Sequence, residues 1–142
     1  MTTSGGRIVL MIAALGLLGT CGVAANQQAE TEAVQVADQW LALVDEGQFA
    51  SSWDQAAELF KGAISKDQWE KSLTAVRTPL GPRVTRKVKE AQYATSLPGA
   101  PDGEYVMIQY ETSFQKKRSA IETVTPMRDP DGKWRVSGYF IK

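Results

Sequence analysis

The chain has 142 residues, the length of one domain, and its 16 basic residues balance its 16 acidic residues. A domain without a basic surplus lacks the charge expected of a nucleic-acid-binding protein, so we expect no nucleic-acid partner. The sequence contains no histidine, and its one cysteine is Cys21. This composition excludes histidine general bases, serine–histidine and cysteine–histidine nucleophile pairs, and nearly all common zinc and iron sites. We therefore expect no cofactor and no metal.

The first 25 residues have the pattern of an export signal. A short segment with one positive charge, Arg7, precedes an unbroken apolar run over residues 8–19, which is too short for a spanning helix of roughly 20 residues. Small residues stand three positions and one position before Asn26, which favours cleavage by signal peptidase at that point. The pattern predicts a periplasmic or secreted protein with a signal over residues 1–25.

Two alternatives for this segment remain open. Residues 18–21 resemble a lipoprotein box, in which Cys21 would be acylated and would anchor the protein in the cell envelope. Thr20, just before the cysteine, fits such a box poorly. An uncleaved signal would also hold the protein at the membrane. Contact with a membrane is expected only under one of these two alternatives.

Helical periodicity dominates the first half of the remaining chain. We expect a polar leader over residues 26–33 and a single α+β domain over residues 34–142, with the first helix running from Thr31, as its N-cap, to a C-terminus at Gly47. A second helix is expected to begin at Ser51 or Ser52, with capping-box spacing between Ser52 and Gln55.

A third helix is expected over residues 65–78, again with capping-box spacing at its start, and the proline and glycine residues that follow would end it. After Pro82 the pattern changes to strand alternation. It predicts strands over residues 84–93, 105–114, 120–128 and 133–141. Helices followed by an antiparallel meander indicate an α+β fold, with three helices on one face of a curved four-stranded sheet.

Several stretches of this sequence resemble the bacterial domain of unknown function 4019, a family of small exported proteins with no assigned activity. The stretches that carry the resemblance are Trp40–Asp45, Gly47, Ser51–Trp53, Val76–Gly81, Ser96–Tyr105 and Asp131–Tyr139. The order of elements is also similar to that of NTF2-like domains, cone-shaped α+β folds whose sheet wraps around a pocket and which commonly pair through the outer sheet face. The resemblance implies a pocket between helices and sheet and a homodimer, and it supplies no catalytic residues.

An NTF2-like isomerase or dehydratase would need a carboxylate base and a hydrogen-bond donor inside the cone. Asp38 or Asp54 together with Tyr110 would supply them, because Tyr110 lies on the apolar face of its strand. We favour the simpler interpretation, in which both carboxylates face water and Tyr110 bonds the backbone. No residue is therefore expected to be catalytic.

The acidic residues Glu104, Asp129 and Asp131 could suggest a calcium site, but their spacing does not match a calcium loop. Asp, Pro and Gly at residues 129–132 are also what a hairpin turn requires, so we expect a turn there and no metal.

Four aromatic residues are the candidates for lining an apolar ligand pocket: Trp40, Trp53, Tyr110 and Trp134. The simpler alternative is that the tryptophans fill the core, because the mature domain has no disulfide to stabilise it. Taken together, the sequence favours an exported, non-catalytic module that binds a small apolar ligand or an envelope protein. A small enzyme and a purely structural envelope protein are the alternatives.

The signal pattern yields a direct prediction. The purified exported protein should begin at Asn26, because the small residues before it provide the best cleavage site after the apolar run. Intact-mass spectrometry of the native protein measures this. A mature protein that begins at an acylated Cys21 would contradict the prediction and make the protein a lipoprotein.

Overall fold

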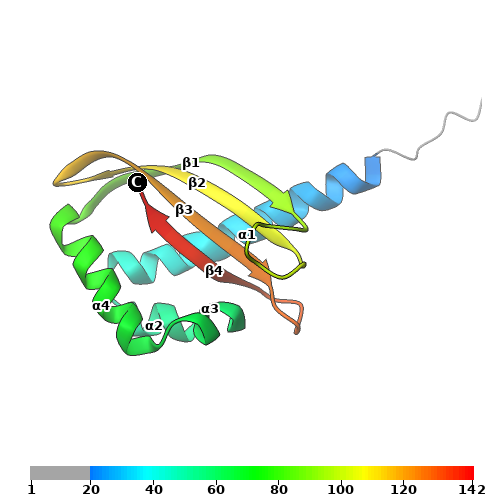
Figure 1. Ribbon diagram of the computed structural model, residues 1–142. Coiled ribbons are helices and arrows are strands. Elements are labelled where there is room, and N and C mark those ends of the chain that lie inside the picture. Colours follow the sequence, from blue (N-terminus) through cyan, green and yellow to red (C-terminus); the bar gives the residue numbers. More distant parts are fainter. Residues whose placement is uncertain (1–19) are drawn as a thin grey trace, which may run out of the picture.

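The computed structural model describes residues 20–142, and within them the chain forms an α+β fold (Figure 1). The helices are α1 (Thr20–Asp45), α2 (Phe49–Asp54), α3 (Glu58–Ala63) and α4 (Lys66–Arg77), followed by the short 3₁₀ helix η1 (Thr78–Leu80). The strands are β1 (Arg83–Ala94), β2 (Tyr105–Phe114), β3 (Lys117–Arg128) and β4 (Trp134–Ile141). The expected apolar part of the export signal and the side chain of Cys21 lie outside the described residues.

The first helix begins earlier than the sequence predicted. α1 starts at Thr20, and residues 26–33, expected as a polar leader, are helical. Thr31 is inside the helix rather than at its cap, and its hydroxyl donates to the carbonyl of Gln27 one turn earlier (2.9 Å). Buried alanines extend the apolar stripe toward the N-terminus, from Ala37 back to Ala29. None of the helices in residues 20–142 combines the length and the hydrophobicity of a membrane-spanning segment.

The expected second helix is in fact two short helices, so the described part of the chain has four α-helices and not three. The break lies at Ala57, whose backbone is extended and whose N–H donates to the carbonyl of Val136 in β4 (2.8 Å). A backbone group used for docking on the sheet is not available for a continuous helix. The capping box expected at Ser52 and Gln55 is wrong, because Ser52 is inside α2.

The capping box expected at the start of α4 is confirmed. The hydroxyl of Ser65 accepts from the backbone N–H of Gln68, and the Gln68 side chain accepts from the backbone of Ser65. Gly47 has a positive φ of 76° just after α1, as its expected position past a helix C-terminus requires.

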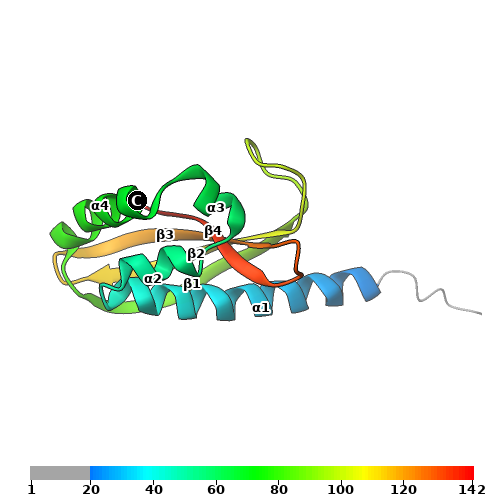
Figure 2. The same ribbon diagram turned by 90° about the horizontal axis from the view of Figure 1, so that it is seen from below.

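The sheet is antiparallel and open, with the strand order β1-β2-β3-β4. All helices lie on one of its faces, and α1 contacts all four strands (Figures 1 and 2). The alternation predicted for β2 is confirmed: Tyr110 is 1% exposed and shares the inner, helix-facing side with Ile108 and Phe114. The NTF2-like cone is not confirmed.

The space between helices and sheet is filled by aromatic side chains. The rings of Trp40 and Tyr139 lie 5.3 Å apart, and those of Phe60 and Trp69 lie 4.8 Å apart in an edge-to-face contact. Trp40 and Trp69 also touch each other, with ring centroids 6.0 Å apart. Trp40, Phe60 and Trp69 belong to the buried core, and Tyr139 is partly buried and packs against it. The inner face of the sheet is therefore packed where an apolar ligand was expected.

Ser52 connects this cluster to α2. Its hydroxyl accepts from the indole N–H of Trp69 (2.9 Å) and donates to the carbonyl of Phe49 (2.6 Å). We predict that Ser52→Ala lowers the free energy of unfolding by about 1–3 kcal/mol, because a buried indole N–H loses its acceptor. Urea unfolding measures this, with the exposed Ser119→Ala as the control, expected to change stability by less than about 0.5 kcal/mol. Equal stability of the two variants would contradict the prediction.

Candidate functional site

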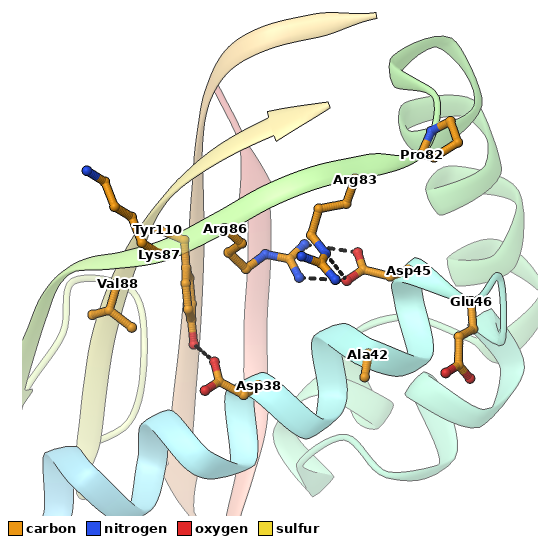
Figure 3. Close-up of a pocket in the computed structure, with 10 residues that line it drawn as sticks. All are labelled: Asp38, Ala42, Asp45, Glu46, Pro82, Arg83, Arg86, Lys87, Val88 and Tyr110. Atoms are coloured by element: carbon orange, nitrogen blue, oxygen red, sulfur yellow. Dashed lines mark hydrogen bonds and ion pairs between the residues drawn. The ribbon is translucent and has the colours of Figure 1, made fainter. Parts of the chain in front are cut away.

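A solvent-open cleft of about 510 Å³ lies between α1 and β1 (Figure 3). Helix α1 contributes carboxylates to it, β1 contributes basic and apolar side chains, and β2 contributes one tyrosine. The residues that matter for the argument are Asp38, Asp45, Arg83, Arg86, Val88 and Tyr110. Several charged side chains from α1 and β1 converge on this cleft, and we take it as the candidate site.

Arg86 is the central residue of the site. It lies on the inner face of β1, where alternation aims its side chain under the sheet, and the side chain is only 9% exposed. Its two Nη atoms donate to both carboxylate oxygens of Asp45, at 2.6 and 2.9 Å. Its Nε donates to Glu122 at 2.7 Å. One guanidinium thus joins α1, β1 and β3.

Glu122 is a fully buried carboxylate on the inner face of β3. Besides Arg86 it accepts hydrogen bonds from the hydroxyls of Thr112 and Tyr139. Burial, together with the charge of Glu122, raises the pKa of Tyr139 far above its usual value. Tyr139 therefore stays a donor, and it connects the ionic group to the aromatic core.

Asp45, the last residue of α1, receives three guanidinium groups. Arg77 donates to Oδ1 (2.8 Å) and Arg83 to Oδ2 (2.9 Å), in addition to the two bonds from Arg86. Burial alone would raise the pKa of Asp45, but the hydrogen bonds from Arg86 and Arg77 outweigh it and hold this pKa below its usual value. Asp45 is therefore ionised at neutral pH.

Tyr110 and Asp38 form a direct pair in the cleft. The Tyr110 hydroxyl donates to Asp38 Oδ1 at 2.8 Å (Figure 3). The expectation that Tyr110 would bond the backbone is wrong, because α1 passes close enough for the two side chains to meet. Asp38 is exposed to water, as expected, and accepts the Tyr110 hydroxyl in addition. Burial, and then the hydrogen bond to Asp38, raises the pKa of Tyr110 far above its usual value. Asp54, the other candidate carboxylate, instead pairs with Lys66 (2.6 Å) outside the cleft.

The four predicted pocket residues are not brought together in one cage. The indole N–H of Trp40 donates to the carbonyl of Ser52, that of Trp53 to the carbonyl of Ile64, and that of Trp134 to Glu32. Only Tyr110 lines the cleft. Each of the three indole groups thus has a partner within the fold.

The acidic residues near the β3–β4 turn are held by arginine. Arg135 bonds both Asp129 (2.9 Å) and Asp131 (2.8 Å), and the hydrogen bond from Arg135 lowers the pKa of Asp131 to about 2. Gly132 has the positive φ (82°) that the expected turn requires. Among the described residues, no group of three or more histidine, cysteine, aspartate or glutamate side chains is arranged to hold a metal ion.

Sequence reasoning missed Arg86, Asp45 and Glu122. The available signal was alternation: on β3, Glu122 shares a face with Val124 and Pro126, which are buried. A carboxylate within an apolar face needs a buried cation, and a basic residue at an inward position of another strand of the same sheet is the natural candidate.

Comparison with known families agrees with the resemblance noted in the sequence. The family model described as protein of unknown function DUF4019 matches residues 36–139, from within α1 to near the end of β4. The chain belongs to this family. A search of curated proteins finds no match.

The buried ionic group gives a stability prediction. Glu122→Gln should lower the free energy of unfolding by about 3–5 kcal/mol, because an amide nitrogen would replace one acceptor oxygen and Arg86 would lose a charged partner in the interior. Glu111→Gln, on the outer face of the adjacent strand, is the matched control and should change stability by less than about 0.5 kcal/mol. Chemical unfolding monitored by tryptophan fluorescence measures both. A similar small effect for the two variants would show that the buried pair contributes little.

Proposed function

We propose that this protein is a non-catalytic binding module of the bacterial cell envelope, and that it holds its ligand in the cleft between α1 and β1. The observation that carries the proposal is a group of charged side chains fixed at the wall of an open cleft: Arg86 and Arg83 are both tied to Asp45, and Tyr110 is tied to Asp38. Such side chains are already ordered, so a ligand does not have to immobilise them on binding. The export pattern at the N-terminus supports the envelope as the place of action.

The charges in the cleft favour recognition over proton transfer. Acid–base catalysis works best with a group whose pKa lies near the working pH. Here the pKa of Asp45 is lowered and that of Tyr110 is raised, so neither group changes its charge near neutral pH. Arg86 is held charged by its two carboxylate partners, which offset the burial that would lower its pKa.

A second candidate, an isomerase-type enzyme, draws on the Asp38–Tyr110 contact, since a carboxylate beside a phenol is what such chemistry needs. In this pair, however, the phenol proton is donated to the carboxylate. It would have to turn away before it reached a developing oxyanion on a substrate. The binding module is the better supported of the two.

The chemistry of the cleft favours an anionic ligand group. Three guanidiniums share the single carboxylate of Asp45, and only Arg86 has Glu122 as a second carboxylate partner. Arg83 is 39% exposed and lines the mouth of the cleft (Figure 3). A carboxylate or phosphate group of a ligand would complete its coordination. An apolar ligand between helices and sheet is less well supported, because aromatic side chains fill that space.

The proposal is tested by nuclear magnetic resonance titration of the ¹⁵N-labelled protein with acetate, succinate and benzoate, and with ethylamine and benzylamine as cationic counterparts. We expect the carboxylates, and not the amines, to shift the Arg83 side-chain signal and the backbone amide of Val88. Arg83→Gln should reduce the shift at Val88 at least fivefold, whereas Arg118→Gln, an exposed arginine at the start of β3, should not. Shifts confined to the indoles of Trp40 and Trp69, or no carboxylate preference, would overturn the proposal.

A further inference from the structure

The cleft continues along α1 as a groove. A second hollow of about 530 Å³ lies between α1 and β1 on the other side of Val88 and is lined by Val34, Val88 and Ala91 together with polar residues of α1. Val88 lines both hollows and is 44% exposed. The groove therefore has a charged half, near Arg83, and an apolar half, near Val34, with a valine between them.

This groove runs beside a strand whose outer edge has no neighbour in the described residues. β1 is the first strand of the sheet order and is 12 residues long. The opposite edge, β4, is met by α3, where the N–H of Ala57 bonds the carbonyl of Val136. Of the helices, α1 provides the main contact with β1. A long edge strand with unpaired backbone groups is a template for another strand.

One backbone contact shows where this edge ends. The N–H of Tyr93 leaves the sheet and donates to the carboxylate of Glu30 in α1 (3.0 Å). Residues of an antiparallel strand alternate between pairing with the neighbour and facing away from it, so Ala91, two positions earlier, directs its N–H and C=O to the same free edge. Glu30 thus closes the edge at Tyr93. From Ala91 back toward Arg83 the described residues place no strand against the edge, and its register with β2 shifts between Val88 and Glu90 and again between Arg83 and Thr85.

The charge of β1 selects the kind of strand that fits. The exposed basic residues of the strand are Arg83, Lys87 and Lys89, against one exposed acidic residue, Glu90. Arg86 is held by Asp45 and Glu122, and Lys87 pairs with Glu111 on the outer face of the sheet at 3.1 Å. Lysines on an edge strand discourage pairing with neutral strands or with a second copy of the same edge. A strand of opposite charge is attracted instead, and its carboxylates would meet Arg83 and the exposed lysines.

We propose that β1 accepts an acidic, extended segment of a partner protein as a fifth strand, with apolar side chains of that segment in the apolar half of the groove and its carboxylates toward Arg83 and the exposed lysines. This inference rests on the proposed function of the α1–β1 cleft and names the class of its ligand. Main-chain hydrogen bonds supply affinity, and the two hollows with the basic edge supply specificity. The interaction weakens as salt increases, because the contributing charges are exposed.

The test uses a synthetic peptide of about ten residues that alternates valine and glutamate, enough to span most of β1 at about 3.3 Å per residue. Two control peptides keep the length: one alternates valine and lysine, and one keeps the glutamates but carries N-methylated valines, which cannot donate backbone hydrogen bonds. Isothermal titration calorimetry should give at least tenfold tighter binding for the first peptide than for either control.

Protein variants locate the binding. Val88→Asp and Lys89→Glu should each weaken the binding of the valine–glutamate peptide at least tenfold. Both side chains are exposed enough that we expect the variants to fold. Lys71→Glu is the matched control, an exposed lysine on α4 whose reversal should change binding less than twofold. Thermal unfolding confirms that each variant is folded.

Hydrogen exchange distinguishes strand addition from other modes of binding. The amide of Ala91 should become at least tenfold more protected in the complex, whereas the amide of Gln92, which already faces β2, should not change. Tight binding without protection at Ala91, or equal binding of the lysine peptide, would overturn this inference. If the peptide fails to bind while small carboxylates still shift Arg83, the inference fails and the proposed function stands.

Discussion

The structure depends on one buried cation that joins three elements. Arg86 sits on the inner face of β1 and holds Asp45 of α1 with its two Nη atoms and Glu122 of β3 with its Nε. Neither carboxylate could be buried without such a partner, since an uncompensated ion in the interior is strongly destabilising. Replacing all three with apolar residues of similar volume could yield an equally stable fold. What the ionic group contributes beyond stability is a fixed position of the C-terminal end of α1 against the sheet.

That position explains why the molecule has a cleft at β1 and a packed core at β4. Near β4 the aromatic rings of Trp40, Trp69 and Tyr139 fill the space between helices and sheet. Near β1 the side chains of α1 are small or charged, as Ala42 and Asp38 are, and leave room above the helix. Tyr139 belongs to both regions, because its ring packs on Trp40 while its hydroxyl bonds Glu122. Tyr139 therefore links the packing of the aromatic core to the hydrogen bonds of the ionic group beside the cleft.

Much of the fold could be predicted from residue patterns, and the misses have physical causes. Alternation along β2 predicted its bounds and the buried position of Tyr110, because each strand residue faces one side of the sheet only. The break between α2 and α3 could not be predicted, since it depends on a hydrogen bond from Ala57 to a strand about 80 residues later in the chain. The start of α1 was missed because alanines carry a weak hydrophobic signal, although Ala29 and Ala33 are buried.

The site was harder to predict than the fold because its chemistry is assembled from distant parts of the chain. Asp38 and Tyr110 stand 72 positions apart, and each alone has a simpler interpretation: a solvated carboxylate and a half-buried phenol. Only the crossing of α1 under the sheet brings them within hydrogen-bond distance. The same helix lies beneath the inner face of β1, so the outer edge of that strand has no neighbouring strand in the described residues and meets α1 only through Glu30 at Tyr93. The polar wall and the open edge thus both follow from the position of α1. A ligand that contacts both would therefore recognise the arrangement of α1 against β1 as well as the charges of the cleft.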